Sequence, residues 1–184
     1  MDSIVFIDAE ISYTTNKIND LGAVKPNNDK FHSSSIISFK KFIDNCEYIC
    51  GHNIIHFDFE HLKKDITFNR NIKLIDTLYL SPLLYPKNPY HKLVKDDKIY
   101  SGEKNNPLVD SIKAKDLFYD EVSAFKSLPI EMKNIYYFLL HNLLEFSGFF
   151  KFLEYKNSID VNDKYIKNIF RNYICDKTIM RNAV

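Results

Sequence analysis

Three successive patterns of apolar residues limit the fold of this chain more than any other feature of its sequence. Residues 3–9 and 18–25 are rich in Ile, Val and other strand-forming side chains, and the turn signal PNND (26–29) separates them from a returning strand in KFHSSSI (30–36). Strand and helix patterns then alternate to about residue 84, and helical spacing continues alone from residue 105. This order predicts an α/β fold built around a mixed, five-stranded sheet flanked by helices.

The alternating middle part supplies the remaining strands. ISFKKFIDN (37–45) and HFDFEHLKKD (56–65) are predicted as helices, and CEYICGHN (46–53) as a short strand ending at Gly51. KLIDTLYLSPLL (73–84) predicts a strand that leads into a helix. We therefore expect a core domain over residues 1–125 and a helical C-terminal extension over residues 126–184, packed on that domain or leading to a further one.

Composition excludes several classes of protein. Of 184 residues, 45% are hydrophobic and only 4 are Gly, which excludes a disordered or Gly-rich chain. The formal net charge of +1 neither favours nor excludes a nucleic-acid partner. No apolar run reaches the ~18 residues of a membrane span, and three cysteines without zinc-ligand spacing indicate reduced thiols. We expect a cytoplasmic protein with no membrane association.

Two acids interrupt the first predicted strand. Asp8 and Glu10 lie one residue apart in IVFIDAE (4–10), and alternate residues of a strand point to the same face. Their carboxylates are therefore expected to converge. A surface position is the simpler interpretation of such a pair when it is taken alone.

Two further acids follow at element boundaries. Asp58 comes after a strand end, Gly51 and a His-Asn pair, where it either reaches back towards the first strand or only caps a helix. Asp110 lies on the apolar stripe of a helix whose start is marked by Asn106 and Pro107. A carboxylate on such a stripe is costly unless it is paired or binds metal. Together the four acids predict a site for Mg²⁺ or Mn²⁺, which prefer oxygen ligands.

These segments resemble a known family. FIDAE (6–10), GHNIIHFD (51–58) and the helical Asp110 resemble the three motifs of the DEDD (DnaQ-like) 3′-to-5′ exonucleases, and GHNIIHFD is similar to the form with one extra residue between Asn and Phe-Asp. KINDLGAV and LIDTLYLSPLL resemble its second strand and its Asp-Thr-Leu segment, so the resemblance covers about residues 3–120. YHKLVKD, NNPLVDSIKAKDLF and EFSGFFKF are similar to the exonuclease-like region that precedes some RecQ-type helicases.

The resemblance implies a ribonuclease H-like fold and a metal-dependent exonuclease. Its substrate would be the 3′ end of single-stranded nucleic acid, with DNA favoured over RNA, and a helicase domain is an expected partner. Two Mg²⁺ or Mn²⁺ ions would be held by Asp8, Glu10, Asp58 and Asp110, with Asp8 bridging both ions. Glu10 and Asp110 would hold the ion that activates water, and Asp58 the other. A two-metal site of this kind stabilises both the attacking and the leaving oxygen.

One departure from the family pattern concerns the general base. The family has His five residues, or Tyr four residues, before its last Asp, whereas this chain has Asn105 and Asn106 there. An amide does not accept a proton at neutral pH, so His91 is the candidate replacement. The alternative is that His91 only orders its loop.

Other side chains are candidates for substrate contact. His52 and Asn53 either contact the terminal sugar or fix the strand end, and Lys92 either contacts a phosphate or belongs to a solvated face. Asn105 is a further substrate-binding candidate. The aromatic residues from Tyr136 to Phe150 are expected to be core, with base stacking as the alternative.

The missing base leaves a second functional hypothesis open. The chain would then be a weakly active or inactive module of the same fold that binds nucleic acid, or a domain that positions a neighbouring helicase. Retention of all four acids favours the enzyme, and Asn105 favours the binding module.

Overall fold

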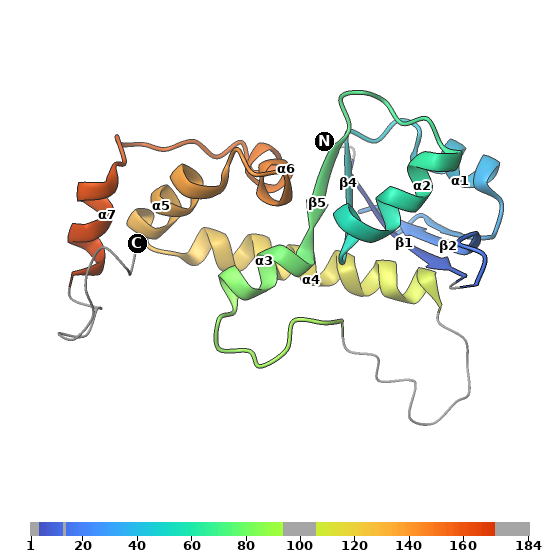
Figure 1. The fold of residues 1–184 in the computed structure, drawn as a ribbon, viewed down its shortest axis with the longest axis horizontal. Helices are drawn as coiled ribbons and strands as arrows, with labels where there is room; N and C mark the ends of the chain where they lie inside the picture. Colours follow the sequence, from blue (N-terminus) through green and yellow to red (C-terminus); the bar gives the residue numbers. More distant parts are fainter. Residues whose placement is uncertain (1–3, 13, 94–105, 172–184) are drawn as a thin grey trace.

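The computed structural model describes residues 4–12, 14–93 and 106–171, and a five-stranded sheet lies at its centre (Figure 1). Its strands are β1 (Ile4–Ile11), β2 (Ile18–Val24), β3 (Lys30–His32), β4 (Tyr48–Gly51) and β5 (Lys73–Asp76), in the order β3-β2-β1-β4-β5. β2 is antiparallel to β1 and β3, whereas β4 is parallel to β1 and β5. The predicted α/β fold with a mixed sheet is confirmed, and it is compatible with the ribonuclease H-like fold.

Helices flank the sheet and continue beyond it. They are α1 (Ile36–Ile43), the π-helix η1 (Ile54–Asp58), α2 (Phe59–Asp65), α3 (Thr77–Leu84), α4 (Pro107–Ser127), α5 (Ile130–Leu140), α6 (Leu144–Phe152) and α7 (Asp163–Phe170). In Figure 1, α4 runs along the sheet, and α5, α6 and α7 gather at the end away from α1 and α2. None of the helices in the described part of the chain combines the length and the apolar character that crossing a bilayer requires.

Alternation along β1 assigns its side chains to two separate cores. Val5 and Ile7 belong to the core formed with α1, η1 and α2. Ile4 and Phe6 belong to the core formed with α4 and α6, where the Phe6 ring lies 5.5 Å from that of Phe118. The even-numbered residues of β1 therefore face α4, because successive strand side chains point to opposite faces.

The C-terminal helices pack directly on the sheet through α6. A Cβ atom at Gly148 would lie 1.9 Å from the carbonyl oxygen of Leu74, so only glycine lets α6 approach β5 this closely. Phe149 and Phe150 join the α4 side of the core with Phe125, as expected for core aromatic residues. Helix α4 itself runs across the proposed boundary between residues 125 and 126, which stays a prediction.

Two elements differ from the sequence prediction. β3 has three residues instead of extending through KFHSSSI, because Ser35 leaves the sheet to cap α1 by accepting a hydrogen bond from Ser38 N at 3.3 Å. The helix expected over 56–65 is divided into the π-helix η1 and α2, with Asp58 at their junction. Both differences are local, and the order of helices and strands along the chain is as predicted.

Between α3 and α4 lies a buried carboxyl group. Glu121 of α4 is 0% exposed, and its Oε1 accepts a hydrogen bond from Ser81 Oγ at 2.7 Å. Burial raises the pKa of Glu121 from 4.5 to about 9, and the charges of Asp76 and Asp120 add to this rise while the Ser81 hydrogen bond opposes it. The folded protein therefore holds a protonated Glu121 at neutral pH.

Replacing Glu121 with glutamine is expected to stabilise the fold increasingly as the pH rises. Between pH 4.5 and about 9, Glu121 is ionised when unfolded but protonated when folded, so stability decreases with pH. The slope from this group is about 1.4 kcal/mol per pH unit, or about 3 kcal/mol in total at pH 7. Urea unfolding of Glu121→Gln at about pH 6 and pH 8 measures the effect, with the exposed Asp116→Asn of the same helix as control. Parallel pH profiles for the variant and the parent protein would contradict it.

Candidate metal centre

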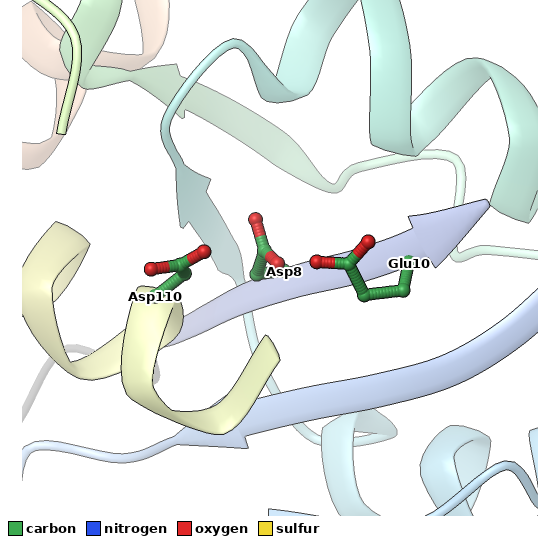
Figure 2. A group of neighbouring side chains, drawn as sticks. All are labelled: Asp8, Glu10 and Asp110. Carbon is green, nitrogen blue, oxygen red and sulfur yellow. The ribbon is translucent and has the colours of Figure 1, made fainter. Parts of the chain in front are cut away.

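The two acids of β1 continue the series of side chains that faces α4. Asp8 and Glu10 are the next even-numbered residues of β1 after Ile4 and Phe6, so they face the same side of the sheet. Unlike Ile4 and Phe6, they are not part of the hydrophobic core on that side. Both are half-buried. Figure 2 shows their carboxylates on one side of β1, turned towards each other. The predicted convergence of this pair is confirmed.

The third acid comes from α4. Asn106 caps the helix by accepting hydrogen bonds from Leu108 N at 3.1 Å and Val109 N at 3.4 Å, and Pro107 occupies the first helical position. Asp110, in the first turn, is only 8% exposed and points at Asp8 (Figure 2). A carboxylate near a helix N-terminus is favoured by the helix dipole.

Carboxylate oxygens of Asp8, Glu10 and Asp110 lie within 4.8 Å of one another. Ligands on opposite sides of a Mg²⁺ or Mn²⁺ ion lie about 4 Å apart, because each bond is about 2.1 Å long. Small rotations of these side chains would therefore let all three contact one cation. The donor set is oxygen only, which fits hard divalent cations better than Zn²⁺ or copper. The three residues could hold a metal ion of this kind.

A glycine in β2 allows Asp110 to reach the strand. Gly22 pairs with Asp8 across the antiparallel β1–β2 ladder. A Cβ atom at Gly22 would lie 2.1 Å from the carbonyl carbon of Pro107 and 2.2 Å from Leu108 N. The first turn of α4 therefore rests directly on the backbone of β2, at the level of Asp8.

Asp58 lies beside this group without joining it. Its Oδ1 accepts a hydrogen bond from Ala9 N at 2.9 Å, and the side chain is buried. Burial raises the pKa of Asp58 well above its ordinary value, the charge of Asp8 raises it further, and the Ala9 hydrogen bond opposes the rise. Asp58 thus reaches back to β1, as one of the two alternatives predicted, and its side chain makes no capping hydrogen bond to α2.

A second buried acid fixes the turn that carries Asp58. Asp76, at the end of β5, accepts hydrogen bonds from Asn53 N at 2.8 Å, Ile55 N at 3.1 Å and Leu78 N at 3.0 Å. Asn53 has a φ of 67°, in the left-handed region that Asn tolerates better than most residues. The π-helix starts at the next residue and ends at Asp58, so Asp76 positions Asp58 through the backbone between them.

His52 connects this turn to the segment containing His91. His52 Nδ1 lies 2.8 Å from Thr77 Oγ1, and Thr77 Oγ1 donates to the carbonyl oxygen of Gly51 at 3.3 Å. Burial lowers the pKa of His52 to about 4; the backbone of His91 and the charge of Asp110 oppose this decrease, and the charge of His91 adds to it. His52 is therefore neutral at physiological pH, and both His91 and Asp110 lie close enough to act on it.

The structure brings most of the predicted site residues to one region. Asp8, Glu10 and Asp110 form one group, Asp58 adjoins Asp8, and His91 and Asp110 each lie close enough to His52 to change its pKa. Asn53 contributes its backbone N–H to Asp76, and Lys92 is exposed. Asn105 lies outside the described residues.

Sequence reasoning missed two residues that position the site. Gly22 is one of only 4 glycines and lies within a predicted strand, a place where Gly often marks the close approach of another backbone. In the sequence, Asp76 stands out only as part of an Asp-Thr-Leu segment. Its place at the end of a strand, before a helix, is the pattern of an N-cap.

No family model matches the sequence, and no curated protein matches it.

Proposed function

We propose that this protein is a metal-dependent 3′-to-5′ exonuclease of the DEDD (DnaQ-like) type that acts on single-stranded nucleic acid. The observation that carries the proposal is the group formed by Asp8, Glu10 and Asp110, with oxygens within 4.8 Å of one another although Asp110 is far from the other two in the sequence. Asp58 next to Asp8 supplies the fourth acid. The 3′-to-5′ direction and the preference for DNA come from the motif resemblance.

The roles that the motif resemblance implies are supported by the positions of the side chains. Asp8 lies between Glu10 and Asp110 (Figure 2) and also interacts with Asp58, which supports the proposal that it contacts both of two cations. Glu10 and Asp110 would hold one ion, and Asp58 the other. Two Mg²⁺ or Mn²⁺ ions would neutralise the scissile phosphate and lower the pKa of the attacking water.

The proposal extends to the surroundings of the site. His52, Asn53, Asn105 and Lys92 are proposed to contact substrate, and a helicase domain is the proposed protein partner. Cys46 and Cys50 are free thiols, which fits a reducing compartment such as the cytoplasm.

The direct test is digestion of an end-labelled single strand with Mn²⁺ or Mg²⁺. With a 5′ label, digestion from the 3′ end gives a ladder of progressively shorter fragments, whereas a 3′ label is released at once as a mononucleotide. EDTA should abolish both signals. If the protein binds the strand in EDTA but gives no metal-dependent ladder, the exonuclease proposal is wrong and the binding module is favoured instead.

Replacing His91 with alanine is expected to lower the rate by about a hundred-fold, the lower end of general-base effects. His91 interacts with His52, on which Asp110 also acts, and we propose that its imidazole takes a proton from the attacking water. His61→Ala is the matched control, because the His61 ring hydrogen-bonds within its own helical segment to Phe57 O at 2.9 Å. Equal rates for the two variants would exclude His91 as the base.

A further inference from the structure

A concave site lies away from the carboxylates. A pocket of about 810 Å³ is formed where the starts of β4 and β5 meet α5, α6 and the segment that follows α6. Tyr48 lines this pocket and pairs with Ile4 in the β1–β4 register, four residues before Asp8. Four residues of strand span about 13 Å, so the pocket and the acidic group lie at opposite ends of the sheet.

The lysines of the pocket give it a positive character. Lys73 forms an ion pair with Glu47, and its ammonium lies 4.9 Å from the centre of the Tyr48 ring. Lys151 and Lys156 also line the pocket, and both are exposed, with Glu154 between them in sequence. Once Lys73 and Glu47 are counted as a neutral pair, the lysines exceed the acids, which favours an anionic ligand.

Flat rings lie beside these lysines. The rings of Tyr137 and His141 are stacked, with centroids 4.4 Å apart and planes 12° apart, and Tyr155 meets Tyr137 edge-on at 5.8 Å. All three residues line the pocket. His141 Nδ1 hydrogen-bonds to the carbonyl oxygen of Tyr137 at 2.7 Å, so Nδ1 is the donor and Nε2 of the neutral ring is an acceptor. Aromatic faces together with an acceptor suit a planar base that carries amino groups.

We infer that this pocket binds a nucleotide unit of the single-stranded substrate, at a distance from the site of cleavage. The base would pack against Tyr137 and His141, and the adjoining phosphate would lie on Lys151 and Lys156. That the nucleotide belongs to single-stranded nucleic acid rests on the proposed function. A long strand would then contact the protein at both ends of the sheet, whereas a dinucleotide is too short to do so.

Fluorescence anisotropy in EDTA tests the inference without cleavage. A labelled single strand of about 20 nucleotides is the probe, because single-strand site sizes are of that order. Lys151→Glu combined with Lys156→Glu should weaken its binding by about ten-fold or more, since phosphate contacts dominate such affinity. Lys41→Glu combined with Lys64→Glu makes the same change of net charge on exposed positions of α1 and α2, and should weaken binding much less. Equal losses for the two double variants would overturn the inference.

Further measurements in the same binding assay identify the ligand. His141→Ala keeps both lysines, and it should still weaken binding if a base packs on the ring; unchanged binding would overturn the stacking role. If AMP competes with the labelled strand, the ligand of the pocket is a free nucleotide. If only unlabelled strand displaces it, the ligand is single-stranded nucleic acid. A polyglutamate peptide that competes as well as the strand would overturn nucleotide recognition.

Cleavage of a dinucleotide separates the two proposals. The pocket double variant, Lys151→Glu with Lys156→Glu, should cleave the dinucleotide at the parental rate with Mn²⁺. If the pocket binds the strand but no substrate is cleaved, the exonuclease proposal fails and the pocket stands. If cleavage is metal-dependent but the pocket variant binds the long strand normally, only the pocket inference fails.

Discussion

Replacing Asp8 with asparagine is expected to lower the rate of metal-dependent hydrolysis by about a thousand-fold or more. Asp8 lies between Glu10 and Asp110, and its charge also acts on Asp58, so it is next to each of the other three acids. The amide is neutral and would weaken the hold on both ions. A loss of about 4 kcal/mol in transition-state stabilisation corresponds to this factor. Initial rates on an end-labelled strand with Mn²⁺ measure it.

The same variant should remain folded. Asparagine has nearly the same shape as aspartate, and the charge of Asp8 raises the pKa of Asp58, which means that the two carboxylates repel each other. The urea midpoint of Asp8→Asn without metal should therefore equal or exceed that of the parent protein. Asp116→Asn, on the exposed side of α4, is the control for loss of an acid elsewhere. Activity within about ten-fold of the parent rate would exclude Asp8 from the chemistry.

Replacing Gly22 with alanine is expected to destabilise the protein by about 3 kcal/mol or more and to weaken metal binding as well. The added Cβ would lie 2.1 Å from Pro107 C, and neither the strand nor the helix backbone yields easily. Helix α4 would have to move by more than about 1 Å to restore ordinary contact. Asp110 is carried by that first turn and would move away from Asp8. Urea unfolding and Mn²⁺ titration of the folded variant measure the two effects.

Gly148→Ala is the matched control for this substitution. Its Cβ would lie 1.9 Å from Leu74 O, so the clash is equally severe, but it separates α6 from β5 and leaves Asp8 and Asp110 untouched. Both variants should lose stability, and only Gly22→Ala should lose metal affinity in the folded state. Equal metal affinity for the two variants would show that the approach of α4 to β2 does not position Asp110.

The sequence predicted the order of elements because their signals are local. Strand alternation placed Asp8 and Glu10 on one face, and the Asn106-Pro107 pair marked the start of α4 correctly. The burial of Asp110 followed from its place on the helical stripe. Each of these inferences needs only a few neighbouring residues and the period of a strand or a helix.

Long-range contacts account for what the sequence did not reveal. Gly22 is required by the backbone of α4, which lies far away in the chain, and Asp76 is required by backbone N–H groups of a turn on another element. The π-helix that ends at Asp58 also depends on that turn. A π-helix takes up more residues per turn than an α-helix, and η1 occurs in the segment where GHNIIHFD has one extra residue.

Mn²⁺ binding to the parent protein and to Asp110→Asn tests the central claim most directly, because Asp110 reaches the site only through the fold. Electron paramagnetic resonance of free Mn²⁺ gives the affinity without any substrate, and Asp116→Asn serves as the control on the same helix. Loss of a residue that only supports a metal ligand costs about 10- to 100-fold in affinity. The proposed metal centre predicts that Asp110→Asn weakens binding at least ten-fold and that Asp116→Asn binds like the parent protein. Equal affinities for all three proteins, or no binding to the parent, would contradict it.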